Sequence, residues 1–423
     1  MKFLFRRTFI FATFFSFSFL SFAQLPMKDE LVKSLLKKHI TFLAGDKLKG
    51  RLVGSKGEKK AYKYIIKDFK KSGIKPDGTE GFLQAFTTKK NLNNPHGSGN
   101  DSAAVSITGH NVVGFIDNKA INTIVIGAHF DHLGYNEYGG STYQGVKGEK
   151  PHIHHGADDN ASGTAALLVL AEFLSKAGYK NNNYLFIAFS GEEEGLLGSN
   201  YFCKHPTIDM SKITYMINMD MLGRLDTAKQ IFSISGTGTS PTWNITLPTI
   251  SSDNLKVKMD QSGTGPSDHT SFYNSGIPVL HFFTGTHYDY HKPSDDEEKI
   301  NYNGELSVIK YIYTLVGKLD SEPKLAFTKT KEDTAERVSF KVTLGIMPDY
   351  LYEGKGVGVD GVTDGKPASK AGILRGDIIL QLGEIKTDDM QAYMKALSKF
   401  NKGETTKVKV LRAGKEEIFD LTF

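Results

Sequence analysis

The chain has 423 residues, with 52 lysines and arginines against 47 aspartates and glutamates, and one cysteine. Its formal net charge is +5 at pH 7, and it falls to +2 without the first 23 residues, which hold three basic residues and no acidic one. A charge this near zero argues against nucleic acid as a partner. The single Cys203 excludes an internal disulfide, so packing must hold the fold together. The length suits a larger domain with a smaller module.

Residues 1–23 have the pattern of a secretory signal peptide. A basic start leads into a Phe-rich apolar stretch, and the small residues Ser21 and Ala23 precede the polar Gln24. Cleavage is expected after Ala23. The apolar stretch is short for a membrane span, so a stable membrane anchor is not expected. The sequence predicts export, either to the periplasm or out of the cell.

Residues 24–318 are predicted to form one α/β domain. Apolar residues recur at helical spacing through residues 29–43, and residues 164–177 predict a second strong helix. Gly50, Arg51 and Gly54 are expected in a polar turn before another helix. Four apolar runs of strand length lie at residues 121–128, 184–189, 213–219 and 277–283. Strands that alternate with helices imply a mostly parallel sheet with helices on both faces.

Each apolar run gives way to a polar side chain that can bind a metal. His129 follows the first run and Glu193 the second, while Asp220 follows the third and His291 lies in the turn after the fourth. Asp159 lies in the loop before the second predicted helix. In open α/β sheets, ligands bind beyond the carboxyl ends of the strands. These loops can therefore converge on one site.

The five side chains are two imidazoles and three carboxylates, which are ligands that zinc accepts. If one carboxylate is shared, each of two ions has three protein ligands and keeps open positions for water and substrate. Two metals roughly 3.5–4 Å apart can lower the pKa of a bridging water and polarise a carbonyl group. The sequence therefore predicts a site for two Zn²⁺ ions, although cobalt or manganese could fill the same ligands.

Six segments resemble, in order, the family of co-catalytic two-zinc aminopeptidases related to bacterial leucine aminopeptidase and glutamate carboxypeptidase II. They read GAHFDHLG, GADDNASGTAALL, FIAFSGEEEGLLGS, INMDMLGR, PSDHTSFYNSGIPVLHF and YHKPSDD. One such motif is weak evidence, but six in order are highly specific, and the resemblance covers about residues 30–318. It implies the zinc exopeptidase fold and the hydrolysis of peptides.

The resemblance also implies a role for each matched ligand. His129 and Glu193 would be terminal ligands on different ions. Asp220 and His291 would complete the two coordination spheres. Asp159, the second acid of GADDN, would bridge the two ions.

Three further residues are implied to act beside the metals. Glu192 matches the general base that takes a proton from the bridging water and delivers it to the leaving amine. Asp131 matches the acid that orients the His129 ring, because ligating imidazoles usually donate their other N–H group to a carboxylate. Tyr290 is a candidate hydrogen-bond donor to the oxyanion, with Tyr288 equally close along the chain.

Other polar residues near these motifs are expected to support the site without binding metal. Asp158 is expected to support its turn, and Asp268 and His269 to surround the site. The histidines of PHIHHG, residues 151–156, are interpreted as part of a mobile loop beside the cleft in preference to a third metal site.

The C-terminal part of the chain changes character. Residues 319–337 are charged with little apolar periodicity and are predicted to be a linker. Residues 338–423 hold short strand-like runs around a helical segment at 390–400, which predicts a small β-rich domain.

This domain resembles a PDZ domain. Residues 344–346 fit the carboxylate-binding loop, although LGIMPDY departs from the commoner Gly-Leu-Gly-Phe type, and PASKAGILRGDIILQLGE fits the helix-turn-strand core. PDZ domains add a peptide strand to a sheet edge and hold its terminal carboxylate with backbone N–H groups. A C-terminal peptide is therefore an expected ligand, and docking against the larger domain without a ligand is the alternative.

The predicted function is that of an exported two-zinc exopeptidase, specifically an aminopeptidase that removes N-terminal residues from peptides. A carboxypeptidase is the first alternative, because pocket residues outside these motifs set the polarity. Glutaminyl cyclase shares the fold, but the uninterrupted GADDNASG and EEEGLLGS segments favour a hydrolase. A non-catalytic scaffold that binds peptides through the PDZ-like domain is the last alternative, and the complete ligand set argues against it.

Overall fold

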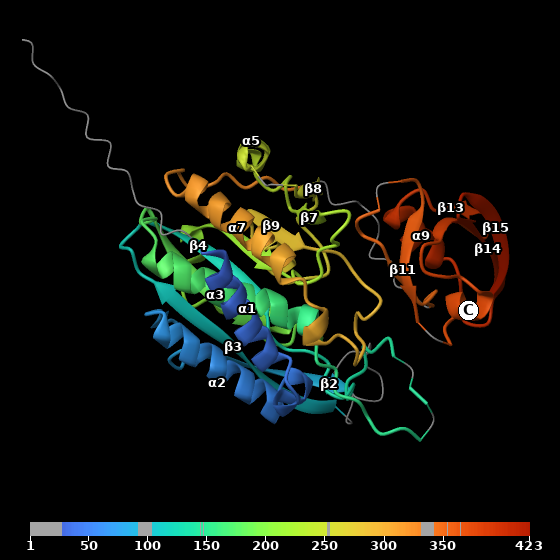
Figure 1. The fold of residues 1–423 in the computed structure, drawn as a ribbon, viewed down its shortest axis with the longest axis horizontal. Helices are drawn as coiled ribbons and strands as arrows, with labels where there is room; N and C mark the ends of the chain where they lie inside the picture. The colour runs from blue at the N-terminus through green and yellow to red at the C-terminus, as the bar shows by residue number, and fades with distance from the viewer. Residues whose placement is uncertain are drawn as a thin grey trace, which may run out of the picture.

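The computed structural model describes residues 28–91, 104–143, 145–146, 148–251, 254–330, 342–352, 354–363 and 365–423. Within these ranges the chain forms two sheets, which lie in two separate bodies (Figure 1). The expected signal peptide lies outside the described residues. No helix in the described ranges is long and apolar enough to cross a membrane.

The first sheet has nine strands in the order β1-β3-β5-β4-β6-β9-β7-β8, with β2 paired to β3. The strands are β1 Lys75–Pro76, β2 Leu83–Asn91, β3 Ala104–Ile116, β4 Asn122–His129, β5 Asn182–Phe189, β6 Ile213–Met219, β7 Ile231–Ser235, β8 Lys256–Met259 and β9 Val279–Phe283. The central strands β5, β4, β6 and β9 are parallel. Antiparallel pairs join β1, β2 and β3 at one side and β7 to β9 at the other. The predicted mostly parallel sheet is confirmed.

Helices cover both faces of this sheet. They are α1 Asp29–Leu43, α2 Lys56–Lys71, α3 Gly163–Lys176, α4 Leu197–Lys204, α5 Pro241–Thr246, α6 His269–Tyr273 and α7 Tyr302–Leu319. Successive residues of a strand point to opposite faces. Ile124 and Ile126 of β4 therefore join the core cluster under α1, α2, α3 and α7, whereas Val125 joins the cluster under α4 and α6.

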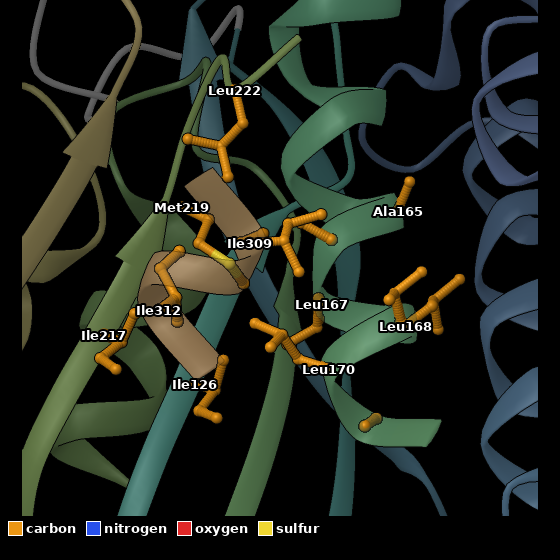
Figure 2. Packing of buried hydrophobic residues seen from close by; sticks show 14 of the residues in the cluster. Ile126, Ala165, Leu167, Leu168, Leu170, Ile217, Met219, Leu222, Ile309 and Ile312 are labelled. Carbon is orange, nitrogen blue, oxygen red and sulfur yellow. The ribbon is translucent and has the colours of Figure 1, made fainter. Parts of the chain in front are cut away.

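The core under α3 and α7 is closely packed (Figure 2). Leu167 and Leu170 of α3 meet Ile309 and Ile312 of α7 above the sheet, and each of them is fully buried. Every residue of β5 and β6 is buried as well. Strands covered on both faces read as continuous apolar runs, which is why the sequence predicted β4, β5, β6 and β9 correctly. This core holds the strand ends rigidly in place.

The described part of the expected linker packs on the first domain. After α7 the chain runs to Thr330 along that domain. Leu325 is buried in the main core, and its N–H group donates to Thr214 Oγ1 at 3.0 Å. The Thr330 hydroxyl lies 2.9 Å from the hydroxyl of Tyr273. One buried leucine thus anchors an irregular segment, and residues 331–341 lie outside the described ranges.

The second sheet belongs to the β-rich C-terminal domain. Its strands are β10 Ile346–Pro348, β11 Val357–Val362, β12 Ile378–Leu382, β13 Ile385–Lys386, β14 Thr405–Arg412 and β15 Lys415–Thr422, with helices α8 Pro367–Ala371 and α9 Met390–Leu397. All pairs are antiparallel, and β10 lies at one edge. The domain has its own core, which includes Leu344, Ile379 and Val410. A small β-rich domain is confirmed.

Polar contacts join the two domains. Lys258 at the end of β8 donates to the backbone carbonyls of Tyr350 and Tyr352 at 2.9 and 2.7 Å. Thr286 donates its hydroxyl to the carbonyl of Pro348 at 2.9 Å. The C-terminal domain therefore contacts the loop that follows β9, which also carries one of the predicted metal ligands.

Candidate metal centre

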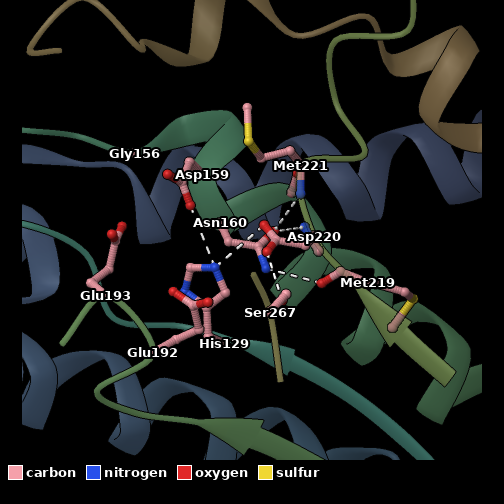
Figure 3. Close-up of polar contacts among 12 residues, drawn as sticks. His129, Gly156, Asp159, Asn160, Glu192, Glu193, Met219, Asp220, Met221 and Ser267 are labelled. Atoms are coloured by element: carbon pink, nitrogen blue, oxygen red, sulfur yellow. Dashed lines mark hydrogen bonds and ion pairs between the residues drawn. The ribbon is translucent and has the colours of Figure 1, made fainter. Parts of the chain in front are cut away.

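The five predicted ligands meet at the carboxyl ends of the central strands, and Figure 3 shows His129, Asp159, Glu193 and Asp220 among them. His129 is the last residue of β4, Asp220 directly follows β6, and Glu193 follows β5. Asp159 lies in the irregular helical turn Ala157–Ser162 that precedes α3. His291 comes from the loop after β9 and has a left-handed backbone, with φ of 56°. Five segments far apart in the sequence thus deliver one cluster.

Asp159 lies between two groups of ligands. Its Oδ1 atom is 3.4 Å from His129 Nε2, which in turn is 3.3 Å from Asp220 Oδ1. Its Oδ2 atom is 3.1 Å from His291 Nε2, which is 3.0 Å from Glu193 Oε2. Each oxygen of Asp159 faces one imidazole and one further carboxylate. This is the arrangement expected of a carboxylate shared between two cations.

The donor atoms fit zinc. Nitrogen and oxygen ligands bind zinc at about 2.0–2.2 Å, so neighbouring ligands of a tetrahedral ion lie roughly 3.4 Å apart. The imidazole-to-carboxylate separations of 3.0–3.4 Å in the two groups agree with that spacing. The five side chains are 1–14% exposed, and they come from the end of β4 and from the loops at the same edge of the sheet, so they are already gathered to hold a cation.

Opposite charges shift the pKa values of these groups. Burial alone would lower the pKa of His129, but its carboxylate neighbours, Asp220 first, raise it well above the ordinary value. Burial also opposes ionisation of Glu193, yet His291 and His132 bring its pKa well below the usual range. The carboxylates thus draw positive charge into the pocket, and bound cations are the strongest source of such charge.

Glu192 lies beside the group formed by His129 and Asp220, with donor atoms of all three within 4.8 Å of one another. Burial raises the pKa of Glu192 well above its ordinary value, and the negative charge of Asp220 adds to the shift while His129 opposes it. A carboxyl group in this position can act as a general base that accepts a proton and returns it. Its position and chemistry suit the general-base role implied by the sequence.

Asp131 lies next to His129 without a close hydrogen bond to its ring. His129 Nδ1 is 3.7 Å from Asp131 Oδ1. Asp131 Oδ1 instead accepts a hydrogen bond of 3.2 Å from the backbone N–H of Glu192. Asp131 therefore joins the β4 loop to the β5 loop, and its effect on the His129 ring is electrostatic.

The structure distinguishes the two candidate tyrosines. The Tyr290 ring stacks on the His291 ring with 3.9 Å between centroids. Burial and the nearby carboxylates, Asp159 first, raise the pKa of Tyr290 well above its ordinary value. Tyr288 is 54% exposed and lies under the ammonium group of Lys292. Tyr290 is the tyrosine that lies among the ligands.

Arg51 fastens the loops around the site, and the sequence pointed only to a polar turn at this position. The side chain is fully buried at the end of the 3₁₀ turn Asp46–Arg51. It donates to the carbonyl oxygens of Phe130 at 2.7 Å, Leu43 at 2.6 Å, His155 at 2.7 Å and Gly156 at 3.0 Å. Arg51 thus ties the end of α1 to the loops that carry His129 and Asp159.

The charge of Arg51 also matters to the site. Burial lowers its pKa to about 10, while the carboxylates of Asp131 and Asp159 favour the charged form. The guanidinium therefore stays protonated at neutral pH. It places one fixed positive charge beside the carboxylates while all four of its hydrogen-bond partners are neutral carbonyls.

Asp220 is held by polar contacts on both sides (Figure 3). Asn160 donates to the carbonyl of Met219 at 3.0 Å and accepts from the N–H group of Met221 at 3.1 Å. The Ser267 hydroxyl donates to Asp220 Oδ2 at 2.8 Å. Asn160 and Ser267 therefore fix the ligand that follows β6, and the asparagine of GADDN was not predicted to do so.

Asp158 supports its turn, as expected. Its Oδ1 atom accepts from the Gly223 N–H group at 2.6 Å, and its Oδ2 atom is 3.1 Å from His287 Nε2. Asp295 accepts hydrogen bonds from the backbone N–H groups of Asp158 and Asp159 at 3.0 and 3.1 Å. The bridging candidate is thus held through its backbone.

The histidines at residues 152–155 take separate partners. His152 contacts Glu149, His154 contacts Ser141, and His155 contacts Asp46. In the described ranges, the groups able to hold a metal involve none of these three histidines.

Comparison with known proteins gives two matching families. Residues 111–316 match the model described as Peptidase family M28, and residues 329–422 match the PDZ domain model. A probable leucine aminopeptidase of Trichophyton verrucosum (strain HKI 0517) is 30% identical over 227 residues, which cover 51% of this chain and 57% of that protein. Aminopeptidase YwaD of Bacillus subtilis (strain 168) is 27% identical over 237 residues, covering 51% of this chain and 47% of that protein. The chain thus spans about half the length of these curated relatives.

Solved structures show the same fold. Porphyromonas gingivalis glutaminyl cyclase is similar with a TM-score of 0.51 and 15% identity, over 69% of this chain and 98% of that chain. Bacteroides thetaiotaomicron glutaminyl cyclase bound to N-acetylhistamine gives a TM-score of 0.51 and 16% identity, over 67% and 97% of the two chains. At this identity the likeness concerns the fold alone.

Replacement of Arg51 by methionine should destabilise the protein. Three buried carbonyls and one partly buried carbonyl would lose their donor, and each such loss costs about 1–3 kcal/mol unless water replaces it. We expect the free energy of unfolding, measured by urea titration with circular dichroism, to fall by about 3–5 kcal/mol. Lys47→Met, an exposed change in the same turn, is the matched control and should stay within about 0.5 kcal/mol of wild type. Equal stability of Arg51→Met and wild type would contradict the role of Arg51.

Proposed function

We propose that this chain, in which a peptidase family M28 domain precedes a PDZ domain, is a two-zinc aminopeptidase that removes N-terminal residues from peptides. The observation that carries the proposal is the position of Asp159, whose two oxygens face two separate imidazole and carboxylate pairs. The names of the curated relatives, which include leucine aminopeptidases, support the N-terminal direction.

Export is part of the same proposal. The signal-like pattern of residues 1–23 supports transport to the periplasm or out of the cell. An intact Met1 on protein isolated from its native host would contradict this.

The proposed chemistry assigns a task to each residue of the site. His129 and Asp220 would hold one zinc ion, Glu193 and His291 the other, and Asp159 both. When bound, the zinc ions would lower the pKa of an attacking water and polarise the scissile carbonyl.

The remaining steps belong to side chains beside these ligands. Glu192 would accept the proton of the attacking water and return it to the leaving amine. Tyr290 would donate a hydrogen bond to the carbonyl oxygen as negative charge develops there. Asp131 would stabilise the His129 ring through its negative charge.

Replacement of Glu192 by glutamine should remove turnover and keep the metal. The amide cannot accept the proton, so kcat should fall by about 10²–10⁴-fold. Zinc content, measured by elemental mass spectrometry, should match that of wild type, because Glu192 is not a proposed ligand. Glu194→Gln, two positions further along the same loop, is the matched control and should remain active. A Glu192→Gln variant with wild-type kcat would remove Glu192 from the mechanism.

The reaction products separate the aminopeptidase from its alternatives, because they show which end of a peptide is cleaved and whether any cleavage occurs. The carboxypeptidase would use the same zinc centre, and the glutaminyl cyclases share the fold. A non-catalytic scaffold would keep the ligands without turnover. The metal ligands do not distinguish these proteins, so the products must.

We expect the zinc-loaded protein to shorten a free peptide stepwise from its N-terminus and to leave the N-acetylated form of the same peptide intact. The reason is that an aminopeptidase requires a free α-amine. Mass spectrometry of the products is the measurement. Trimming of both forms from the C-terminus would instead identify a carboxypeptidase. Loss of ammonia from an N-terminal glutamine without peptide cleavage would identify a cyclase.

The PDZ domain is proposed to bind peptides through their C-terminal carboxylate. Leu344 and Gly345 lead into the edge strand β10, which begins at Ile346. Gly345 has φ of 76°, and a Cβ atom there would lie 2.2 Å from Lys366 Cβ, so the loop needs glycine at this position. Such a loop presents backbone N–H groups to a carboxylate, and a sheet edge can pair with an added strand.

A labelled peptide with an apolar last residue should bind the full-length protein more tightly with a free C-terminus than with a C-terminal amide. Fluorescence anisotropy with the label on the N-terminus measures both affinities and protects the peptide from N-terminal trimming. We expect the difference to be at least about tenfold, equal to about 1.4 kcal/mol. Equal affinities would favour a PDZ domain that serves only to dock on the peptidase domain.

A further inference from the structure

His132 is a fully buried histidine that lies against Glu193, one of the predicted ligands. It is not one of the five predicted ligands, and the sequence assigned no role to it. His132 Nδ1 is 2.5 Å from Glu193 Oε1 and 3.9 Å from Asp159 Oδ2. The residue lies three positions after His129, on the loop that follows β4. Its other ring nitrogen, Nε2, has no hydrogen-bond partner among the described residues. The contact with Glu193 is thus the one polar contact of this ring that is in hydrogen-bond range.

The two oxygens of Glu193 face different partners. Oε2 lies 3.0 Å from His291 Nε2, on the side of Asp159 Oδ2. Oε1 faces His132 Nδ1. A cation held by Asp159, Glu193 and His291 would therefore meet Oε2, and Oε1 would remain for His132. This division matches a ligand that binds through one oxygen while a hydrogen bond occupies the other.

Packing holds the His132 ring in this orientation. The ring lies against Gly156, where an added Cβ atom would be 2.5 Å from His132 Cδ2 and 2.6 Å from Cγ. The His291 ring approaches edge-on, with 5.7 Å between centroids. The carbonyls of Phe130 and Gly156, which belong to the same two loops, are both fixed by Arg51. The imidazole therefore has little room to turn away from Glu193.

We propose that His132 is a positioning residue whose Nδ1–H group donates to Glu193 Oε1 and keeps Glu193 bound to its cation through Oε2 alone. The inference rests on the proposed two-zinc site. It deepens that proposal, because a carboxylate restrained to one oxygen leaves a coordination position free for substrate. Hydrogen-bond partners of metal ligands typically change metal affinity by about 10–100-fold when removed.

Two substitutions separate this role from direct metal binding. Asparagine at position 132 can place an amide N–H group near the position of Nδ1, but its amide nitrogen does not bind zinc. Alanine offers neither function. His132→Asn should therefore preserve the hydrogen bond to Glu193, whereas His132→Ala should lose it. His152→Ala is the matched control, because His152 lies on the surface and contacts Glu149.

The experiment measures zinc affinity of the full-length variants by competition with a chromophoric chelator, and the visible absorption of the cobalt-loaded forms. We expect His132→Ala to weaken one of two zinc sites by about 10–100-fold. His132→Asn should remain within about threefold of wild type, with an unchanged cobalt spectrum. Circular dichroism must show that each variant is folded, and the asparagine variant keeps the test valid if the alanine variant unfolds.

Two results would overturn the proposal. Equal loss of affinity in both variants with an altered cobalt spectrum would make His132 a direct ligand. Wild-type affinity in His132→Ala would leave it a packing residue. Because metal binding is measured apart from turnover, the two proposals can fail separately. A wild-type protein that binds two metals without cleaving any peptide would contradict the proposed function and leave the His132 inference standing.

Discussion

Mutual repulsion among acidic side chains is the constraint on which the rest of this structure depends. Asp131, Asp159, Glu192, Glu193 and Asp220 lie in one cluster, in which Asp131 and Asp159 are buried and the other three are partly exposed. Two unit charges 4 Å apart repel by about 4 kcal/mol at an effective dielectric constant of 20. Such a cluster is stable only when positive charge lies nearby and when the segments that carry the acidic residues are held together. The fully buried parallel strands hold the segments in place, the imidazoles and a buried guanidinium provide positive charge, and bound cations would add to it.

Much of this arrangement could be predicted from the sequence because its signals are strong and local. A strand covered on both faces must be apolar at nearly every position, so β5 and β6 were evident as continuous runs. A histidine or acid at the end of such a run is chemically conspicuous. Tyr290 and Tyr288 could not be separated in the same way, because the backbone of their loop decides which ring turns toward His291.

The remaining features depend on contacts that leave no pattern in the sequence. Arg51 bonds only to backbone carbonyls, which every residue has, so nothing in its partners identifies it. His132 and Glu193 are 61 residues apart in the sequence. A histidine near a predicted ligand in the sequence does not reveal that its ring approaches Oε1 of a distant glutamate. Leu325 lies with Ala326 and Phe327 in a short apolar stretch of an irregular, charged segment. Only the three-dimensional structure shows that it reaches the core.

The hydrogen bonds of Arg51 also determine when the site can exist. Its acceptors lie 8, 79, 104 and 105 residues away along the chain, so the guanidinium is fully bonded only after long loops have closed, which is an entropic cost of folding. Metal binding to such a site is coupled to the folding of the whole domain. A cation present at 100 times its dissociation constant would stabilise that fold by about 2.7 kcal/mol. Loss of metal would therefore lower the free energy of unfolding of the entire domain and make segments far from the site more susceptible to proteolysis.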